Sequence, residues 1–177
     1  MAPQFVAYRG ISMVEVTLRA ISLLLKSCPA PWTHFINLSA TDYPLMGIHN
    51  LLEVMKLPPQ ELSFAVTMNK CAPPARWRYP WIDDSFGQAS GKAIEAEKLK
   101  GFRKSFPTSF KLHYGDAWVV LSYSFCMFIS NRGFTRVGRL PLEVLLWMTT
   151  MASSPEHYFQ TVLCNSPWKA FRVPDSL

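Results

Sequence analysis

Residues 34–45 have the sequence His34-Phe-Ile-Asn-Leu-Ser-Ala-Thr-Asp-Tyr-Pro-Leu45. The apolar run from Phe35 to Leu38 ends in a Thr-Asp-Tyr-Pro turn, and this pattern predicts a buried strand with Asp42 at its carboxyl end. Open α/β sheets bind their ligands at the carboxyl ends of strands. The segment therefore predicts an α/β fold in which Asp42 lies beside a ligand.

A second segment places a carboxylate at the beginning of an apolar element. It has the sequence Ser153-Ser-Pro-Glu-His-Tyr-Phe-Gln-Thr-Val-Leu-Cys-Asn165. Ser154 suits an N-cap, Pro155 the first helical position and Glu156 the first turn of the helix that follows. An acidic residue there also complements the helix dipole, so the position of Glu156 alone does not separate a structural role from a catalytic one.

The remaining periodicity predicts further elements of an α/β chain. Helices are expected over residues 12–28, where Ser12 and Glu15 have capping-box spacing, over 48–55 and over 140–151. Residues 118–123 favour a buried strand. Between 68 and 109 the periodicity disappears, which predicts a long loop region inside a single domain that spans residues 1–177.

Composition limits the class of protein and its partners. The chain has 177 residues of which 49% are hydrophobic, enough for one buried core. Its net charge of +6 favours an anionic partner. The basic residues are scattered apart from a cluster at 98–104, whose ordinary explanation is a solvated face. Because no clustered basic-aromatic motif is present, we predict no nucleic-acid partner.

Four segments, in order along nearly the whole chain, resemble the core-2/I-branching family of glycosyltransferases. The resemblance is greatest to its plant branch, the glucuronosyltransferases of arabinogalactan. The segments that carry it are Tyr8-Arg-Gly-Ile-Ser-Met-Val14, Phe35-Ile-Asn-Leu-Ser-Ala-Thr-Asp-Tyr-Pro-Leu45, Pro107-Thr-Ser-Phe-Lys-Leu-His-Tyr-Gly-Asp-Ala-Trp118 and Ser153-Ser-Pro-Glu-His-Tyr-Phe-Gln-Thr-Val-Leu-Cys-Asn165.

The resemblance implies a partial GT-A-like, Rossmann-related α/β domain. The implied activity is inverting transfer of glucuronate from UDP-glucuronate to a galactan or arabinogalactan acceptor. Transfer of xylose or N-acetylglucosamine is an alternative, as is a truncated, non-catalytic glycan-binding pseudoenzyme. Family members have a preceding half that binds the nucleotide and later basic residues that bind the diphosphate, so we expect this chain to be a fragment that does not transfer sugar alone. They are Golgi membrane proteins that face the lumen, and we expect their membrane anchor to lie outside this sequence.

Glu156 matches the family's catalytic base, five residues before Thr161. In an inverting transfer, one carboxylate accepts the proton of the attacking hydroxyl. Asp42 has two interpretations, since it can bind a sugar hydroxyl or close an Asx-turn.

Further substrate-binding candidates follow from the same resemblance. Trp118 is expected to be an apolar platform or a core tryptophan. Asp116 stands where the family pattern has serine and adds bulk and charge. In the loop region, Arg76, Trp77 and Arg78 are candidates to meet an acceptor glycan or a uronate. Their alternative is a solvated loop with the tryptophan docked on the core.

No motif predicts a metal or another cofactor. The histidines at 34, 49, 113 and 157 lack ligand spacing, and the cysteines form no Cys-x-x-Cys pair. Asp83-Asp84 is not the Asp-x-Asp of metal-dependent transferases, and the family resembled here uses no metal. We therefore expect metal-independent chemistry with the UDP-sugar as a substrate. The cysteines are consistent with buried thiols or with disulfides, and no apolar run is long enough for a membrane helix.

Overall fold

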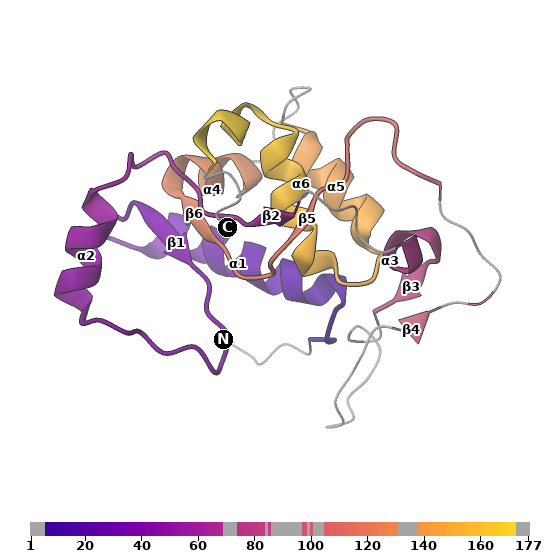
Figure 1. The fold of residues 1–177 in the computed structure, drawn as a ribbon, viewed down its shortest axis with the longest axis horizontal. Coiled ribbons are helices and arrows are strands. Elements are labelled where there is room, and N and C mark those ends of the chain that lie inside the picture. The colour runs from indigo at the N-terminus through magenta and orange to yellow at the C-terminus, as the bar shows by residue number, and fades with distance from the viewer. Residues whose placement is uncertain are drawn as a thin grey trace.

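The computed structural model describes residues 6–68, 74–83, 85, 97–98, 100, 105–130 and 138–172. Helices mix with short strands, as the α/β prediction requires. Figure 1 shows α4, α5 and α6 gathered together, with β1 and α2 at one end of the molecule and α3, β3 and β4 at the other. In chain order the elements are α1 (Ile11–Ser27), β1 (His34–Ile36), α2 (Ile48–Lys56), β2 (Thr67–Met68), α3 (Pro74–Arg78), β3 (Trp81–Ile82), β4 (Glu97–Lys98), β5 (Tyr114–Gly115), β6 (Val120–Ser122), α4 (Tyr123–Ser130), α5 (Leu140–Met148), the 3-10 turn η2 (Ser154–Glu156), α6 (Tyr158–Cys164) and the 3-10 turn η3 (Pro167–Phe171).

The described strands form three two-stranded antiparallel sheets, β1 with β6, β2 with β5 and β3 with β4. In the first sheet, Phe35 lies opposite Leu121. The buried strand expected from Phe35 to Leu38 is wrong in length and burial, because β1 ends at Ile36 and Leu38 is 58% exposed. The sheet is narrow: among the described strands, β1 pairs with β6 alone, so its other edge pairs with no described strand.

The core forms where the helices meet β6. α1 packs against α4 and η2, and α5 packs against α6. α6 is buried along its whole length, so the segment after Glu156 is fixed from all sides. The largest fully buried side chains come from most of these elements: Tyr158, Phe125, Phe159, Ile21, Leu121, Met148, Met151 and Leu163.

Three expected helices are confirmed as α1, α2 and α5, and the expected 118–123 strand is β6, three residues long. Within the expected loop region 68–109, residues 69–73, 84, 86–96, 99 and 101–104 lie outside the described residues. The described part carries α3 and the β3–β4 pair. Cys28, Cys126 and Cys164 are free thiols, and burial raises the pKa of Cys126 to about 12. Cys71 is not among the described residues.

The N-terminus of α1 is capped from a distant segment, so the capping box expected at Ser12 is wrong. α1 begins at Ile11, and the Ser12 hydroxyl, inside the helix, accepts the Ala7 N–H at 2.9 Å. The Ser12 N–H donates instead to the carboxylate of Asp83 at 2.8 Å, which is 71 residues away in sequence. A Cβ atom on Gly10 would overlap that carboxylate, so the close approach of Asp83 requires glycine there.

Replacing Asp83 with alanine should therefore lower the free energy of unfolding by about 1–3 kcal/mol, because the Ser12 N–H at a buried residue loses its acceptor. Denaturant unfolding measures this as a lower midpoint at unchanged slope. Asp83→Asn keeps an acceptor oxygen and should recover most of the loss. Equal midpoints for the wild-type chain and Asp83→Ala would contradict the assigned cap.

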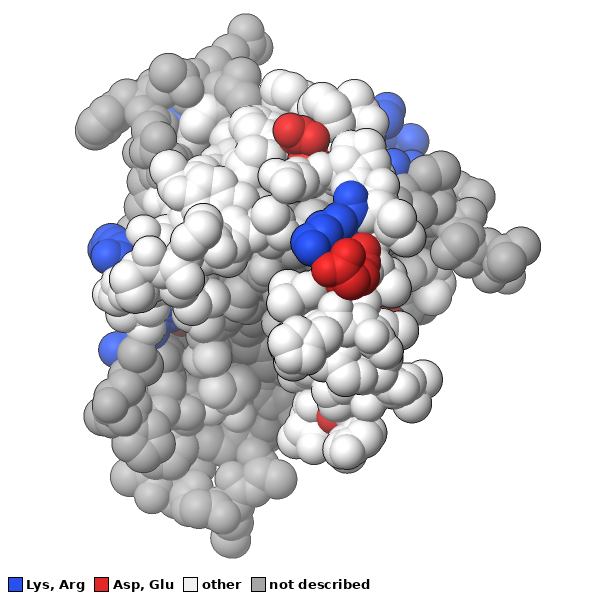
Figure 2. Space-filling view, turned by 90° about the vertical axis from the view of Figure 1, so that its left-hand side faces the viewer, with Lys and Arg blue, Asp and Glu red and all other residues white. Residues whose placement is uncertain are grey.

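The surface around α2 is apolar and lightly charged. α2 has the expected amphipathic pattern, but none of its residues is buried. Leu45 is 97% exposed and Leu57 is 82% exposed. Figure 2, in which the α2 end faces the viewer, shows a mostly uncharged surface with one adjoining basic and acidic pair. The described α2 ion pair joins Lys56 Nζ to Glu53 Oε1 at 2.6 Å.

Candidate active site around Glu156

Glu156 lies at the end of a tight turn that two distant chain segments hold in place. After α5 ends, the Ala152 N–H donates to the carbonyl of Arg76 at 3.2 Å. The Ser153 N–H donates to the carbonyl of Arg9 at 2.9 Å. These bonds join the N-terminal segment and α3 to the residues just before Glu156, so the geometry of the turn depends on the tertiary fold.

The turn contains an uncommon backbone conformation. Ser153 has φ 56° and Arg9, its hydrogen-bond acceptor, has φ 64°. Non-glycine residues in the left-handed region are uncommon, and such strain costs about 1–3 kcal/mol and is often found at functional sites. Here the strained serine directly precedes the 3-10 turn that carries Glu156.

Ser154 does not cap the helix, contrary to the sequence prediction. Its hydroxyl donates to the carbonyls of Met148 and Met151, both at 2.9 Å, so it satisfies carbonyl groups at the end of α5. Glu156 ends η2, and α6 begins only at Tyr158. The carboxylate consequently stands ahead of the helix instead of inside its first turn.

The carboxylate of Glu156 forms an ion pair with the guanidinium of Arg76 from α3. Both side chains are 26% exposed, so the pair is anchored in the protein and still open to a ligand. The Arg76 guanidinium carbon lies 5.0 Å from the centre of the Tyr114 ring, which holds it over β5. The arrangement offers a proton acceptor beside a cation that can hold a carboxylate or phosphate.

His157 is buried behind this pair and is neutral at physiological pH. Its ring centre lies 5.1 Å from that of Tyr114, and its Nδ1–H donates to the Ser153 carbonyl at 2.9 Å. Burial lowers the pKa of His157 to about 4; the charge of Arg76 also lowers it, and the bond to Ser153 opposes the shift. The protonated form is therefore disfavoured in the folded protein.

This burial predicts a pH dependence of stability. Between pH 6.5 and about 4, an unfolded histidine is protonated while His157 in the folded chain is not, so the unfolded state binds more protons and stability falls as the pH falls. In the wild-type chain the free energy of unfolding should fall by a few kcal/mol over this range, and in His157→Phe this fall should be absent. Unfolding midpoints measured from pH 7 to 4 test it, and a variant that loses stability as steeply as wild type would contradict the assignment.

Side chains of α6 and of Asn165, its C-cap, bind the backbone of residues 111–116. Asn165 Oδ1 accepts the Lys111 N–H at 2.9 Å, and Asn165 Nδ2 donates to the Lys111 carbonyl at 2.7 Å. Thr161 Oγ1 accepts the His113 N–H at 3.0 Å and donates to its carbonyl at 3.2 Å. Gln160 donates to the Asp116 carbonyl. These bonds fix the positions of Tyr114 and Asp116 relative to α6, the helix that follows Glu156.

Asp116 ends this bound segment and Trp118 lies two residues after it, and both are exposed. Asp116 Oδ1 accepts the Trp118 N–H at 3.2 Å and so closes a local turn. Trp118 is 40% exposed, which excludes the core-tryptophan interpretation and leaves its indole open as a platform. The contact of either residue with a sugar stays a prediction.

The three loop candidates separate in the structure. Arg76 alone among them pairs with Glu156. Trp77 packs against the core and lies 3.8 Å, centre to centre, from the Phe106 ring, as the docked-tryptophan alternative predicts. Arg78 is exposed, with its guanidinium carbon 5.7 Å from the Trp77 ring centre.

Asp42 is an exposed turn residue. Its Oδ2 accepts the Ser39 N–H at 2.6 Å, and its own N–H donates to the Ser39 carbonyl at 3.2 Å. This geometry is the turn chemistry that the sequence allowed as one of its two interpretations. None of the hydrogen bonds or ion pairs found among the described residues joins Asp42 to Glu156.

The sequence did not indicate Tyr114, His157 or Ser153 as site residues. Tyr114 lies inside the Pro107–Trp118 segment that resembles the family, which was the available signal for it. The left-handed conformation of Ser153 had none, because serine is not typical of that region. In the part of the chain that the structure describes, no three His, Cys, Asp or Glu residues are clustered to hold a metal ion, and no helix is long and apolar enough to span a membrane.

Comparisons with known proteins show the family of the chain. The family model of the core-2/I-branching enzymes matches residues 1–172. The β-glucuronosyltransferases GlcAT14A and GlcAT14B of Arabidopsis thaliana are 37% and 38% identical over 91% and 92% of the chain. The mouse enzyme β-1,3-galactosyl-O-glycosyl-glycoprotein β-1,6-N-acetylglucosaminyltransferase 3 is 24% identical over 89% of the chain.

The chain thus has a helical scaffold with short strands and a carboxylate–guanidinium pair at a strained turn, and it is similar to sugar-transferring enzymes. The chain belongs to the core-2/I-branching enzyme family. It covers 35% of GlcAT14A, 36% of GlcAT14B and 32% of the mouse enzyme, so it spans about a third of the length of these relatives.

Proposed function

We propose that the protein takes part in glucuronosyl transfer, moving glucuronate from UDP-glucuronate to a galactan or arabinogalactan acceptor with inversion. The observation that carries the proposal is the partly exposed Glu156 carboxylate, paired with Arg76, in a chain 37–38% identical to two plant β-glucuronosyltransferases. The proposal concerns the whole protein to which this segment corresponds. A GT-A-like, Rossmann-related domain and a lumenal Golgi location are parts of the same proposal.

In this mechanism Glu156 is the general base. The acceptor hydroxyl gives its proton to the Glu156 carboxylate while its oxygen attacks the anomeric carbon of the donor sugar. The bond from that carbon to the diphosphate oxygen breaks, and UDP leaves with the electron pair. Attack from the face opposite the leaving group inverts the anomeric configuration.

Arg76 supports this role by its position. Its guanidinium pairs with the Glu156 carboxylate and so fixes where that carboxylate lies in the site. The Trp118 indole supplies an apolar surface for the carbon face of a sugar ring, and Asp116 supplies oxygens for hydroxyl groups. Arg78, which is exposed, stays a candidate to meet the acceptor or a uronate.

Two alternatives remain in the same family. The similarity to a β-1,6-N-acetylglucosaminyltransferase supports transfer of N-acetylglucosamine by the same base as one alternative. Transfer of xylose by that base is a variant of it that no relative reported above supports. A glycan-binding pseudoenzyme is the non-catalytic alternative.

A transfer assay with a β-linked galactan acceptor separates these possibilities. We expect the whole protein, and not this segment alone, to use UDP-glucuronate in preference to UDP-xylose and UDP-N-acetylglucosamine. Preference for either of the other donors would replace the glucuronosyl proposal with the corresponding alternative. Saturable galactan binding without transfer from any donor would favour the pseudoenzyme.

The proposed reaction uses no metal. The Glu156 site offers one carboxylate already paired with a cation, which is a poor ligand set for manganese or magnesium. We therefore expect transfer to continue at an unchanged rate after dialysis against a chelator. Loss of activity in the chelator, restored by added manganese, would contradict this expectation.

A further inference from the structure

Four basic residues from two segments of the chain gather beside the C-terminal half of α6, at the opposite end of this helix from Glu156. We call them the basic patch: Lys111, His113, Lys169 and Arg172. Burial lowers the pKa of the half-buried His113, and the charges of the other three residues lower it further. The described charges that act on this histidine are therefore all positive.

The side chains of α6 and its C-cap fix the first segment of the patch. The amide of Asn165 binds both backbone groups of Lys111, and the hydroxyl of Thr161 binds both backbone groups of His113. The Lys111 side chain is exposed and enters none of the ion pairs or hydrogen bonds found among the described residues. Its backbone is thus held in place while its ammonium group is open to a ligand.

The second segment follows α6 directly. η3 carries Lys169, which is exposed and makes no ion pair with a described carboxylate, and Arg172 comes just after η3. The Arg172 guanidinium donates to the Thr67 hydroxyl on β2 and to the Cys164 sulfur on α6. Neither partner is a carboxylate, so these bonds hold the guanidinium without pairing its charge with an acid.

These cations are not needed to cap α6. Basic side chains near the end of a helix often bind its last carbonyl groups. Here the Asn165 amide donates to the Thr161 carbonyl at 2.7 Å, and the Ser166 hydroxyl donates to the Leu163 carbonyl at 3.0 Å. Because neutral side chains fill this role, the charges of the patch are available to an anion from solvent.

The exposure of the two lysines favours a ligand with several negative charges. A single exposed ion pair contributes little to binding, because water and salt screen both charges. A ligand with several carboxylates meets Lys111 and Lys169 at once. Phe171, which is 43% exposed and adjoins Arg172, adds an aromatic ring beside the charges. Aromatic rings pack against apolar faces, and the C–H face of a sugar is such a face.

A short segment joins the patch to the Glu156 site. Tyr114 contacts both Arg76 and His157 at that site. Lys111 precedes Tyr114 by three residues, a stretch of chain that spans at most about 11 Å. A glycan whose reacting unit lies at Glu156 therefore reaches the patch with units only a short distance along its chain.

We propose that the basic patch binds carboxylate groups of the acceptor glycan, so that the protein prefers acceptors that already carry glucuronate. This assignment rests on the proposed function, since it takes the glycan at Glu156 to be the acceptor of glucuronosyl transfer. The carboxylates pair with Lys111 and Lys169, and the ring of Phe171 lies against the C–H face of a sugar. The protein then retains a glycan on which it has already acted.

Calorimetric titration of the whole protein, without donor, tests the proposal. The two ligands are β-linked galactotriose and the same trisaccharide carrying two glucuronate groups. We expect the glucuronate-bearing sugar to bind roughly tenfold tighter at low salt, and this preference to shrink as salt is added. Lys111→Gln and Lys169→Gln should each weaken its binding by roughly two- to fivefold, and the double variant should lose the preference.

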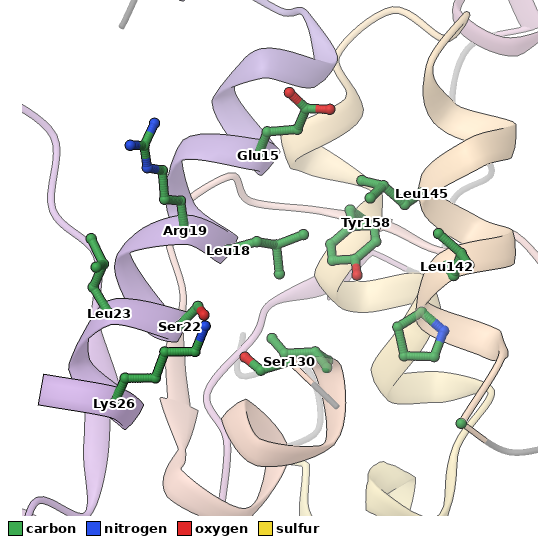
Figure 3. Close-up of a pocket in the computed structure, with 13 residues that line it drawn as sticks. Glu15, Leu18, Arg19, Ser22, Leu23, Lys26, Ser130, Leu142, Leu145 and Tyr158 are labelled. Carbon is green, nitrogen blue, oxygen red and sulfur yellow. The ribbon is translucent and has the colours of Figure 1, made fainter. Parts of the chain in front are cut away.

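Lys26→Gln is the matched control, because Lys26 is also an exposed lysine. Figure 3 shows it on α1, among the residues that line a cavity of about 510 Å³ between α1 and α5. No residue of the basic patch lines that cavity. The variant removes the same charge from another part of the surface and should leave both affinities unchanged.

His113 gives a second readout, located at the patch itself. Bound carboxylates should offset the positive charges around its ring and raise its pKa toward that of a free histidine. An NMR titration of the His113 ring should show this rise with the glucuronate-bearing sugar and not with galactotriose.

The proposal would be overturned by equal affinity for the two sugars, by an unchanged preference in the double variant, by an equal loss in Lys26→Gln, or by an unchanged His113 pKa in the complex. Loss of UDP binding in the double variant would also overturn it, since the patch would then belong to the donor. Absence of transfer together with lysine-dependent binding of the glucuronate-bearing sugar would contradict the proposed function and not the binding role of the patch.

Discussion

In the whole protein, replacing Glu156 with glutamine is expected to lower the turnover of the proposed glucuronosyl transfer by roughly two to four orders of magnitude. Glutamine keeps the shape of the side chain, but its amide cannot accept the proton of the attacking hydroxyl. Because both partners of the Glu156–Arg76 pair are partly exposed, loss of the pair should cost about 1 kcal/mol of stability or less. The variant should therefore stay folded while losing activity. Steady-state kinetics with UDP-glucuronate and a galactan acceptor measure the effect.

The matched control is Glu53→Gln on α2, which removes a carboxylate from an exposed ion pair. It should leave both the turnover and the Michaelis constants unchanged. If Glu156→Gln retained most of the wild-type turnover, Glu156 would not be the base. A rise in the Michaelis constant at unchanged turnover would assign Glu156 to substrate binding alone.

Replacing Gly115 with alanine should cost about 3 kcal/mol or more of stability. An added Cβ would lie 2.7 Å from the Val66 carbonyl carbon, closer still to the Val66 oxygen, and 3.1 Å from Gln160 Cγ. The obstructing atoms belong to backbone that is fixed by the pairing of β2 with β5, where Gly115 lies opposite Thr67. Relief would require the two strands to separate, which would also displace Tyr114 from Arg76.

Gly47→Ala is the control for this prediction. Gly47 is the N-cap of α2, and a Cβ there meets no atom within 4 Å. The control should change stability by at most about 1 kcal/mol. Thermal or denaturant unfolding of the two variants gives the comparison. Equal stability of Gly115→Ala and wild type would show that β2 and β5 do not approach as closely as described.

Periodicity predicted the helices well, because each carries its own pattern. α2 and α5 fall where apolar spacing places them, between turn residues and prolines. The strands were harder to predict. β1 and β6 are each three residues long, which is too short to show an alternation of apolar and polar residues, and they pair across more than 80 residues of sequence. The start of α1 also depends on a distant partner. The Ser12–Glu15 spacing suggested a local capping box, but the carboxylate of Asp83 accepts the Ser12 N–H instead.

Residues of the candidate site could be predicted only where a single segment of sequence contains the signal for them. Glu156 follows from its own segment through the family resemblance. Its pairing with Arg76, 80 residues away, had no local signal, because the fold alone brings α3 beside the turn. Trp77 and Arg78 are neighbours of Arg76 in sequence, yet the helical geometry of α3 directs them elsewhere. Asp42 had two interpretations in the sequence, and the structure shows the one in which it closes its own turn; its contact with a sugar stays a prediction.

A crystal structure of the protein with UDP and a galactan acceptor bound would test the central claim most directly. We predict that the attacking hydroxyl lies within hydrogen-bond distance, about 2.6–3.2 Å, of a Glu156 carboxylate oxygen, with the acceptor sugar against Trp118. An acceptor seated with its hydroxyl groups out of reach of Glu156, directly or through one water molecule, would contradict the claim.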